Sequence, residues 1–326
     1  MAGARSLREP GDVPPGGMPP PGPASAGSAS TSAVAAKAAD ENFPVALRLL
    51  PSRRRRYLMA VYVFARTADD IGDRAPVADR LGLLAELEAD LRRLYDSLPP
   101  PEPPREAARA AESGQSTRTA ELPRLAPVRG LRQAVIDCGI PIGPFLDLIE
   151  ANRQDQVITR YQSVDELFGY CRLSANPVGQ IVLYIFDEFS AAKAKLSDAI
   201  CTGLQLAEHW QDVAEDYRDG RIYLPAEDLA HYGCTEHDLT APPAPAQLKR
   251  LLEFEVERAS ALLDAGAPLV GQLRGAARIA VAGYLAGGRA ALAAIKAADY
   301  DVLAATPQPG RARTLGGLVL ALVRGR

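Results

Sequence analysis

The first residues in this sequence that could do chemistry form an acidic group. Asp69 and Asp73 are four residues apart, so on a helix both carboxylates would project from one face. Like charges at this spacing weaken a helix by roughly 0.2–0.5 kcal/mol, and a cation would offset that cost. Carboxylate oxygens without cysteine or histidine partners suit a hard cation, Mg²⁺ most simply. The spacing therefore predicts a metal-binding face.

A second acidic group has the same spacing. Glu208, Asp212 and Asp216 fall at positions i, i+4 and i+8, which predicts three carboxylates along one stripe of a helix. Mg²⁺ keeps several waters and is commonly completed by phosphate oxygens of a substrate. Two facing carboxylate helices with an arginine nearby would hold a diphosphate through bridging metal ions. The alternative is a solvated charged surface at each group, but both groups lie among apolar residues, which favours the metal site.

The elements that must position these groups have helical patterns. Residues 57–65, directly before the first group, are apolar and uncharged. Leucines recur every three or four residues from Leu81 to Leu94, and a similar pattern runs from Leu251 to Leu263. No alternating segment of useful length predicts a strand. The sequence therefore predicts an all-α protein with a single folded domain.

Composition excludes several classes of function. Of the 326 residues, 47% are hydrophobic and 24% are charged, and the net charge of −3 provides no field that would gather nucleic acid. The 4 cysteines form no C-x-x-C pair, which argues against zinc and redox dithiols. No apolar run approaches the ~18 residues that a membrane span needs. The composition favours a soluble, cytoplasmic protein.

The chain divides into three predicted segments. Residues 1–39 are rich in proline, glycine, alanine and serine and predict a disordered tail, residues 40–305 predict the folded domain, and residues 306–326 predict a basic and apolar tail. Within this last segment, the apolar residues 315–323 are flanked by arginines. This pattern suggests peripheral contact with anionic lipid at the inner face of the cytoplasmic membrane. The alternative is a last helix docked on the core.

Together these motifs resemble the squalene and phytoene synthase family of head-to-head isoprenoid synthases. The resemblance covers about residues 40–305 and rests on four segments in consistent order: Phe64–Asp73, Tyr170–Gly179, Asp212–Pro225 and Tyr300–Leu303. It implies a single-domain isoprenoid synthase bundle of helices around a central hydrophobic cavity. Within the family, further segments are similar to the hydroxysqualene-forming branch of bacterial hopanoid biosynthesis: 41–46, 49–51, 65–73, 153–155, 174–179 and 210–212.

The resemblance also implies a reaction and its residues. Presqualene diphosphate would be converted to hydroxysqualene, with metal neutralising the departing diphosphate and water capturing the carbocation. The implied Mg²⁺ ligands are Asp69, Asp70, Asp73, Glu208, Asp212 and Asp216. The side chains implied at the diphosphate are Arg66, Tyr62 and Arg221. The remaining implied substrate-binding residues are Tyr170, Ser174, Val178, Gly179, Val182, Gln205 and Tyr284. Residues 170–182 would lie along one helix that lines the hydrophobic channel, with Gly179 leaving room for a prenyl chain.

Three positions depart from the family pattern. Glu208 stands where the family usually has asparagine, and its extra charge would alter metal number or affinity. His209 occupies a position that is usually apolar, and the simplest interpretation assigns it no role. The basic residues that many condensing relatives carry before the first helix are absent at residues 40–42, which favours a reaction with one substrate.

Other functions stay open from the sequence. One is a condensing squalene or phytoene synthase, a prenyltransferase that joins two prenyl diphosphates. Another is an all-α Mg²⁺ nucleotide diphosphohydrolase, although the apolar residues 170–186 argue against it. A third is a non-catalytic protein that keeps the fold, for which Glu208 is the sole hint. In the preferred interpretation the partners are a small-molecule isoprenoid diphosphate and enzymes of the same pathway.

Overall fold

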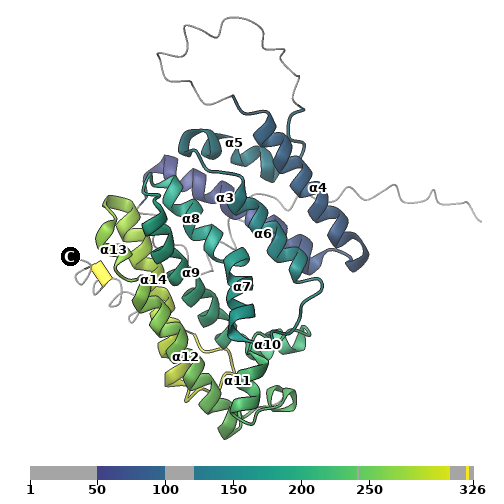
Figure 1. The fold of residues 1–326 in the computed structure, drawn as a ribbon, viewed down its shortest axis with the longest axis vertical. Helices are drawn as coiled ribbons and strands as arrows, with labels where there is room; N and C mark the ends of the chain where they lie inside the picture. The colour runs from purple at the N-terminus through teal and green to yellow at the C-terminus, as the bar shows by residue number, and fades with distance from the viewer. Residues whose placement is uncertain (1–49, 100–120, 241, 309–320, 323–326) are drawn as a thin grey trace, which may run out of the picture.

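The computed structural model describes four ranges of the chain: 50–99, 121–240, 242–308 and 321–322. Within these ranges the chain is helical (Figure 1). They contain no sheet, and their one strand-like pairing is an isolated bridge between Arg160 and Ile222. The all-α prediction is therefore confirmed. The predicted disordered tail and most of the predicted C-terminal tail lie outside the described residues.

The helices carry the labels of Figure 1, which begin at α3. The first four are α3 (Ser52–Arg74), α4 (Val77–Asp96), α5 (Ala126–Cys138) and α6 (Gly143–Gln154). The middle of the chain forms α7 (Val164–Ser174), α8 (Asn176–Ile185), α9 (Ala191–Gln211), α10 (Val213–Arg218) and α11 (Ala226–His231). A short 3₁₀ turn at Glu236–Leu239 precedes α12 (Ala246–Gly266), α13 (Leu269–Gln272) and α14 (Gly275–Ala297).

Two hydrophobic clusters hold the bundle together. One joins α9, α12 and α14, and Trp210 is fully buried in it. The other joins α3, α4, α5 and α6, where Phe64 meets Phe145 edge to face with ring centroids 5.3 Å apart. α8 contributes to both clusters, Leu183 to the first and Ile181 to the second. The two halves of the core therefore meet at α8.

The leucine patterns seen in the sequence form buried stripes. On α4 the buried residues include Leu84, Leu87, Leu91 and Leu94, whereas Leu81 in the second turn is 54% exposed. On α12 the buried residues include Leu251, Leu252, Val256, Ala259 and Leu263. Each stripe follows the 3.6-residue period, because only one face of each helix contacts the core.

The predicted channel helix is two helices. One helix was expected over residues 170–182, but α7 ends at Ser174 and α8 begins at Asn176. Pro177 lies in the first turn of α8, where a backbone N–H would have no acceptor within the helix, so proline loses no hydrogen bond there. A proline at this position cannot continue a preceding helix, so the chain breaks at Ala175. The expectation of one continuous helix was therefore wrong.

α14 packs as a core helix. Among the described residues it is the one helix long and apolar enough to cross a membrane, yet 56% of its most apolar stretch is buried inside the protein. Gly288 allows close contact with α9, because a Cβ there would lie 2.5 Å from a methyl carbon of Leu204. Ala321 and Leu322 pack against the same cluster, and the Leu322 carbonyl accepts a hydrogen bond from Arg278 at 2.7 Å. The contacts of these two residues agree with the alternative in which the C-terminal segment packs on the core as a last helix.

Helix direction places the two acidic groups at the same end of the bundle. The first group lies in the last turns of α3, and the second spans the end of α9 and the start of α10. The opposite end gathers the start of α3, the end of α8 and the starts of α9 and α14. There the Arg54 guanidinium lies over the Phe186 ring at 5.9 Å, and the Arg274 N–H donates to Glu188 at 3.3 Å.

Candidate active site

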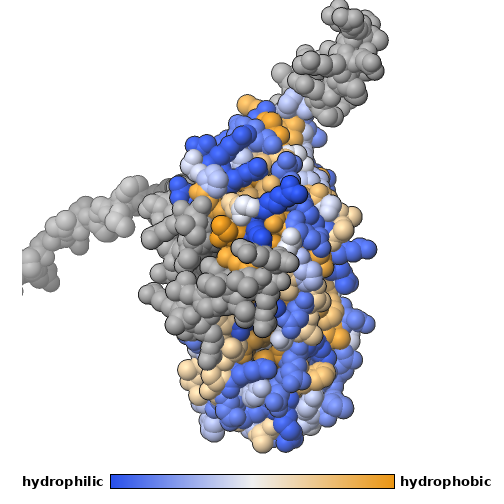
Figure 2. Space-filling model, turned by 90° about the vertical axis from the view of Figure 1, so that its left-hand side faces the viewer, coloured by the Kyte–Doolittle hydropathy of each residue, from blue (hydrophilic) through white to orange (hydrophobic). Residues whose placement is uncertain are grey.

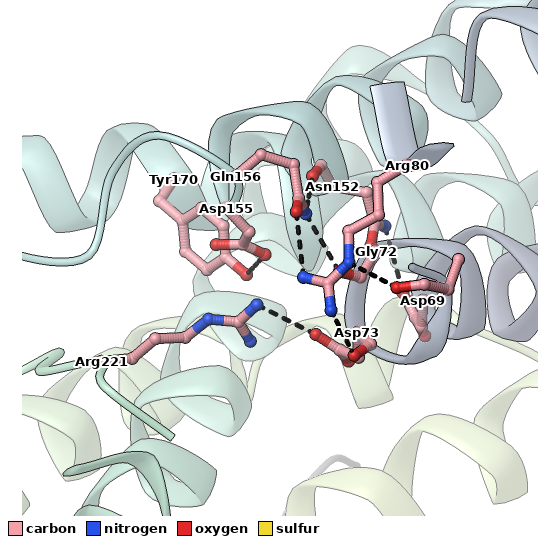
Figure 3. Close-up of polar contacts among 10 residues, drawn as sticks. Asp69, Gly72, Asp73, Arg80, Asn152, Asp155, Gln156, Tyr170 and Arg221 are labelled. Atoms are coloured by element: carbon pink, nitrogen blue, oxygen red, sulfur yellow. Dashed lines mark hydrogen bonds and ion pairs between the residues drawn. The ribbon is translucent and has the colours of Figure 1, made fainter. Parts of the chain in front are cut away.

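The first acidic group is held by α6. Asp69 accepts a hydrogen bond from the Asn152 amide at 3.1 Å, and the Gly72 carbonyl accepts one from Gln156 at 3.1 Å. Gly72 allows this contact, because a Cβ there would lie 2.4 Å from the Asn152 amide oxygen. Figure 3 shows Asn152 and Gln156 reaching from α6 toward the end of α3. The helix end that carries Asp69 and Asp73 is therefore fixed by backbone and side-chain contacts.

Arg80 closes the turn after α3. Its guanidinium donates to the carbonyl oxygens of Asp73 at 2.8 Å and Ala75 at 2.9 Å, and to the Gln156 side chain at 3.1 Å (Figure 3). A helix end leaves several carbonyl groups without partners, and an arginine is well suited to satisfy them. Arg80 therefore orients the end of α3 rather than carrying charge into the site.

Asp70 lies apart from Asp69 and Asp73. It forms ion pairs with Arg66 at 2.8 Å and Arg74 at 3.2 Å, each one helical turn away. Neighbouring positions on a helix differ by about 100° in direction, so Asp70 cannot share the face of Asp69. Arg66, implied at the diphosphate, is thus paired with an implied metal ligand. Tyr62 lies one turn before Arg66 and is partly buried.

Arg221 joins the two acidic groups. It lies in the loop after α10 and forms an ion pair with Asp73 on α3 at 2.9 Å (Figure 3). The Arg221 backbone N–H donates to the Asp216 carbonyl at 2.8 Å, which ties the loop to α10. The predicted meeting of the two groups is therefore present, with a guanidinium between them.

The second acidic group is interrupted where one helix was expected. α9 ends at Gln211 and α10 begins at Val213, with Asp212 at the junction. The four-residue spacing survives, because the Asp212 N–H donates to the Glu208 carbonyl at 3.0 Å and the Asp216 N–H donates to the Asp212 carbonyl at 2.8 Å. Glu208 is exposed, whereas Asp212 and Asp216 are partly buried.

His209 is a buried member of the site. Its ring stacks on Tyr223 with centroids 3.7 Å apart, and its Nε2 lies 3.2 Å from the Gln205 amide nitrogen. Its Nδ1 lies 3.9 Å from an Asp216 oxygen. Burial, with a smaller contribution from Arg221, lowers the pKa of His209 to about 3, so the ring is neutral. His209, to which the sequence assigned no role, is thus buried in the site against Tyr223. Gln205, an implied substrate-binding residue, lies beside His209 and does not line the apolar cavity.

Tyr170 supports another acidic side chain, Asp155 of the α6 C-terminus. The Tyr170 hydroxyl donates to Asp155 Oδ2 at 2.8 Å (Figure 3), and the Tyr170 ring packs among Tyr161, Tyr223 and His209. The other oxygen, Asp155 Oδ1, is buried and has no hydrogen-bond partner among the described residues. Tyr170 therefore lies in the polar site and not in the wall of the apolar cavity.

Burial raises the pKa of several carboxyl groups in the site. Burial raises the pKa of Asp69 and, with repulsion from Glu215, that of Asp212. Burial raises the pKa of Asp155 to about 6, against the opposing influence of Tyr170 and Arg221. Burial and then repulsion from Asp212 raise the pKa of Asp216 to about 7. A bound cation would relieve each of these costs.

These carboxylates suit a Mg²⁺ ion that water and substrate phosphate oxygens complete. Within the described part of the chain, no three histidine, cysteine or acidic side chains lie close enough to form a preformed metal site. Mg²⁺ is commonly held by one or two carboxylates and completed by water and substrate phosphate oxygens. The oxygen-only donors, the raised pKa values and the partnerless Asp155 Oδ1 suit that arrangement.

An apolar cavity of about 100 Å³ lies between α8, α9 and α14. Its walls include four of the residues implied for the substrate channel, Val178, Gly179, Val182 and Tyr284. Ser174 does not line it, because the break at Ala175 separates α7 from the cavity. Gly179 was expected to leave room for a prenyl chain, but a Cβ there would lie 2.3 Å from Ser197 Oγ and 2.5 Å from Cys201 Sγ. Its small size therefore serves the contact between α8 and α9.

Four site residues were not predicted from the sequence as functional: Arg80, Asn152, Asp155 and Gln156. Three of them lie on or just after α6 at positions i, i+3 and i+4, on a helix whose other buried residues are mostly apolar. A polar stripe at helical spacing on an otherwise apolar helix was the signal that could have found them. Arg80 offered no such signal, because its partners are backbone carbonyl groups.

The architecture matches that of known isoprenoid synthases. The squalene synthase HpnC from Alicyclobacillus acidocaldarius is 35% identical with a TM-score of 0.70, covering 83% of this chain and 94% of that chain. A dehydrosqualene synthase, 23% identical, shares the fold with a TM-score of 0.74 over 90% of this chain and 94% of that chain.

Proteins with similar sequences belong to the same class of isoprenoid synthases. The hydroxysqualene synthase of Sinorhizobium fredii is 35% identical over 238 residues, which is 72% of this chain and 72% of that protein. Phytoene synthase 2 of Zea mays is 28% identical and covers 87% of this chain and 66% of that protein. Residues 36–315 match the squalene/phytoene synthase family, and the chain belongs to this family. It is therefore an isoprenoid synthase, which argues against the diphosphohydrolase and the non-catalytic alternatives.

Proposed function

We propose that this protein converts presqualene diphosphate to hydroxysqualene and releases diphosphate, in the biosynthesis of squalene and hopanoids. The reaction would be Mg²⁺-dependent and would act on a carbon–oxygen bond, as a lyase. Two facts support this proposal: 35% identity to hydroxysqualene synthases, and two acidic groups that Arg221 links beside an apolar cavity. The link between Arg221 and Asp73 is the observation on which the proposal chiefly rests.

The residues at the acidic end would bind the diphosphate. Asp69, Asp73, Asp212 and Asp216 are the proposed Mg²⁺ ligands, and the charge of the bound metal would favour departure of the diphosphate. Arg221 already reaches the gap between the groups, and its planar guanidinium suits two-point contact with phosphate oxygens. Asp155 adds a buried oxygen that faces the same charges.

The apolar cavity would hold the prenyl chain and the cation. Val178 and Val182 exclude water from the reacting carbons, which protects a carbocation from early capture. The Tyr284 ring lines the same cavity and offers a face that attracts positive charge, worth about 0.5–2 kcal/mol. One water molecule then adds to the cation and releases a proton, which gives the alcohol.

A condensing activity is the second candidate. It would join two prenyl diphosphates, as a prenyltransferase, and it is favoured by the similarity to a squalene synthase at 35% identity. The two candidates differ in substrate, because condensation starts from two molecules and the proposed reaction starts from one.

The deciding experiment uses the purified full chain with Mg²⁺ and without reduced nicotinamide cofactor. Presqualene diphosphate and farnesyl diphosphate are supplied in separate reactions, and the lipid products are separated by chromatography. We expect hydroxysqualene from presqualene diphosphate, loss of turnover with a chelator, and no product from farnesyl diphosphate. A C30 product from farnesyl diphosphate alone would establish the condensing alternative.

A further inference from the structure

The end of the bundle opposite the acidic groups is basic. The first turns of α3 present four consecutive arginines, Arg53 to Arg56. Nearby lie Lys193, Lys195 and Arg274, at the starts of α9 and α14. The neighbouring acidic residues are Asp137, Asp187 and Glu188. We define this basic end by these residues, in which seven cations outnumber three carboxylates.

Two of the three carboxylates at the basic end form ion pairs with cations of the same end. Arg53 pairs with Asp137 at 2.6 Å, and Lys193 pairs with Glu188. Arg55 and Arg56 are exposed on the same helical turn. Four adjacent cations on one helix start repel each other, so an anionic surface opposite them would lower the electrostatic energy.

One exposed aromatic residue and two partly buried ones lie near these cations. Phe189, in the loop between α8 and α9, is 39% exposed and stacks on Tyr184 with ring centroids 4.1 Å apart. The Arg54 guanidinium lies over the Phe186 ring. Figure 2 shows hydrophobic residues next to strongly hydrophilic ones on the part of this side of the molecule that is not drawn in grey. Apolar side chains ringed by cations are typical of contact with anionic lipid.

The basic end is continuous with the apolar cavity. Val178, Val182 and Phe186 follow one another at four-residue spacing along α8, so they share one face. The first two line the cavity, and the third lies beneath Arg54 at the basic end. α9 and α14, which form the other walls, begin at the same end. The cavity is thus placed between the acidic groups and the basic end.

We propose that the basic end docks on an anionic lipid surface and directs the apolar cavity toward the bilayer. This inference rests on the proposed function, because a C30 isoprenoid substrate or product partitions into lipid. The acidic end would then face the aqueous phase, where diphosphate and metal ions are found. The basic end and the acidic groups lie at opposite ends of α3, a helix about 35 Å long at 1.5 Å per residue.

Vesicle flotation of the full chain tests the docking surface. Vesicles of phosphatidylcholine that contain about 30% anionic phosphatidylglycerol are compared with vesicles of pure phosphatidylcholine. The double variant R55E/R56E reverses two exposed charges at the basic end. The control R250E/K296E reverses two exposed charges at the start of α12 and the end of α14, near the acidic end.

We expect the wild type and R250E/K296E to float with the anionic vesicles and to stay in solution with pure phosphatidylcholine. R55E/R56E should lower the partition coefficient by roughly 30-fold or more, and Phe189→Ser by a few-fold. Equal flotation of R55E/R56E and wild type would overturn the proposal. So would absence of wild-type binding to anionic vesicles at low salt.

Two further measurements separate this proposal from the proposed function. Far-ultraviolet circular dichroism and thermal unfolding confirm that each variant is folded. Turnover of presqualene diphosphate in detergent micelles should be the same for R55E/R56E and wild type, because the acidic end is unchanged. Failure of every variant to form hydroxysqualene would refute the proposed function, while the flotation results would stand on their own.

Discussion

The two acidic groups of this protein have the same spacing but different surroundings. In the group on α3, each carboxylate has a partner: Asp69 has Asn152, Asp70 has Arg66, and Asp73 has Arg221. In the group at α9 and α10, Asp216 is partly buried near other carboxylates, and Nδ1 of the neutral His209 ring lies 3.9 Å from it. The first group is held in place by side chains from other elements, whereas in the second group burial and neighbouring carboxylates raise the pKa of Asp216. This difference indicates that a bound cation contributes most at the second group.

Replacing a carboxylate in either group is expected to give the largest effect on activity. Asp69→Asn and Asp216→Asn should each lower turnover by about 10³-fold or more, because a lost metal ligand weakens charge neutralisation on the leaving diphosphate. Stability should separate them. Asp216→Asn should raise the thermal unfolding temperature without metal more than Asp69→Asn does, because the Asn152 amide already stabilises the Asp69 carboxylate. The opposite order would contradict the comparison between the groups.

Arg221 is the link between the groups, and its loss should have the next largest effect. Arg221→Gln should lower kcat/KM by roughly 10- to 100-fold, because a charged hydrogen bond to phosphate contributes about 1.5–3 kcal/mol. Arg218→Gln is a matched control, because Arg218 is exposed at the end of α10. Steady-state kinetics with presqualene diphosphate measures both variants. Similar losses in the two would indicate a general effect of surface charge.

Stability without metal should fall as pH rises. The carboxyl of Asp216 has a pKa of about 7 in the folded protein and 3.8 as its ordinary value, so the folded state holds the proton more strongly across that interval. Stability therefore decreases between about pH 4 and 7, by on the order of 2 kcal/mol after allowance for partial exposure.

Thermal unfolding at about pH 5 and about pH 8, which covers the upper part of this interval, checks this prediction. Added Mg²⁺ should stabilise the wild type more at the higher pH. Asp216→Asn should flatten the pH dependence, whereas Asp219→Asn, at an exposed neighbouring position, should not. An unchanged slope in Asp216→Asn would show that Asp216 is not the group responsible.

Glu208 should give the smallest effect. It is exposed, and its charge contributes to raising the pKa of Asp216 only after burial and Asp212. Glu208→Asn restores the usual residue of the family and should change the Mg²⁺ concentration for half-maximal activity by about 2- to 3-fold. This prediction is checked by measuring the activity of wild type and Glu208→Asn over a range of Mg²⁺ concentrations. A change of more than about tenfold would make Glu208 a principal ligand.

Much of the fold was predictable because helical periodicity is local. The leucine stripes of α4 and α12 follow from residue spacing alone, and the lack of alternating segments excluded a sheet. The break at Ala175 was predictable in principle from Pro177, but the apolar character of the whole segment concealed it. Site prediction succeeded for the carboxylates, since their spacing on one helix is visible in the chain.

The sequence by itself determined the helical class, the two acidic groups and their charge. Only the tertiary structure decided which carboxylates are balanced, because their partners come from other helices: Asn152 from α6 and Arg221 from the loop after α10. It also decided that Tyr170 and His209 pack around the polar site, while Val178, Val182 and Tyr284 enclose the cavity. Burial and partner distance set each pKa and each ion pair, and neither is a property of spacing along the chain.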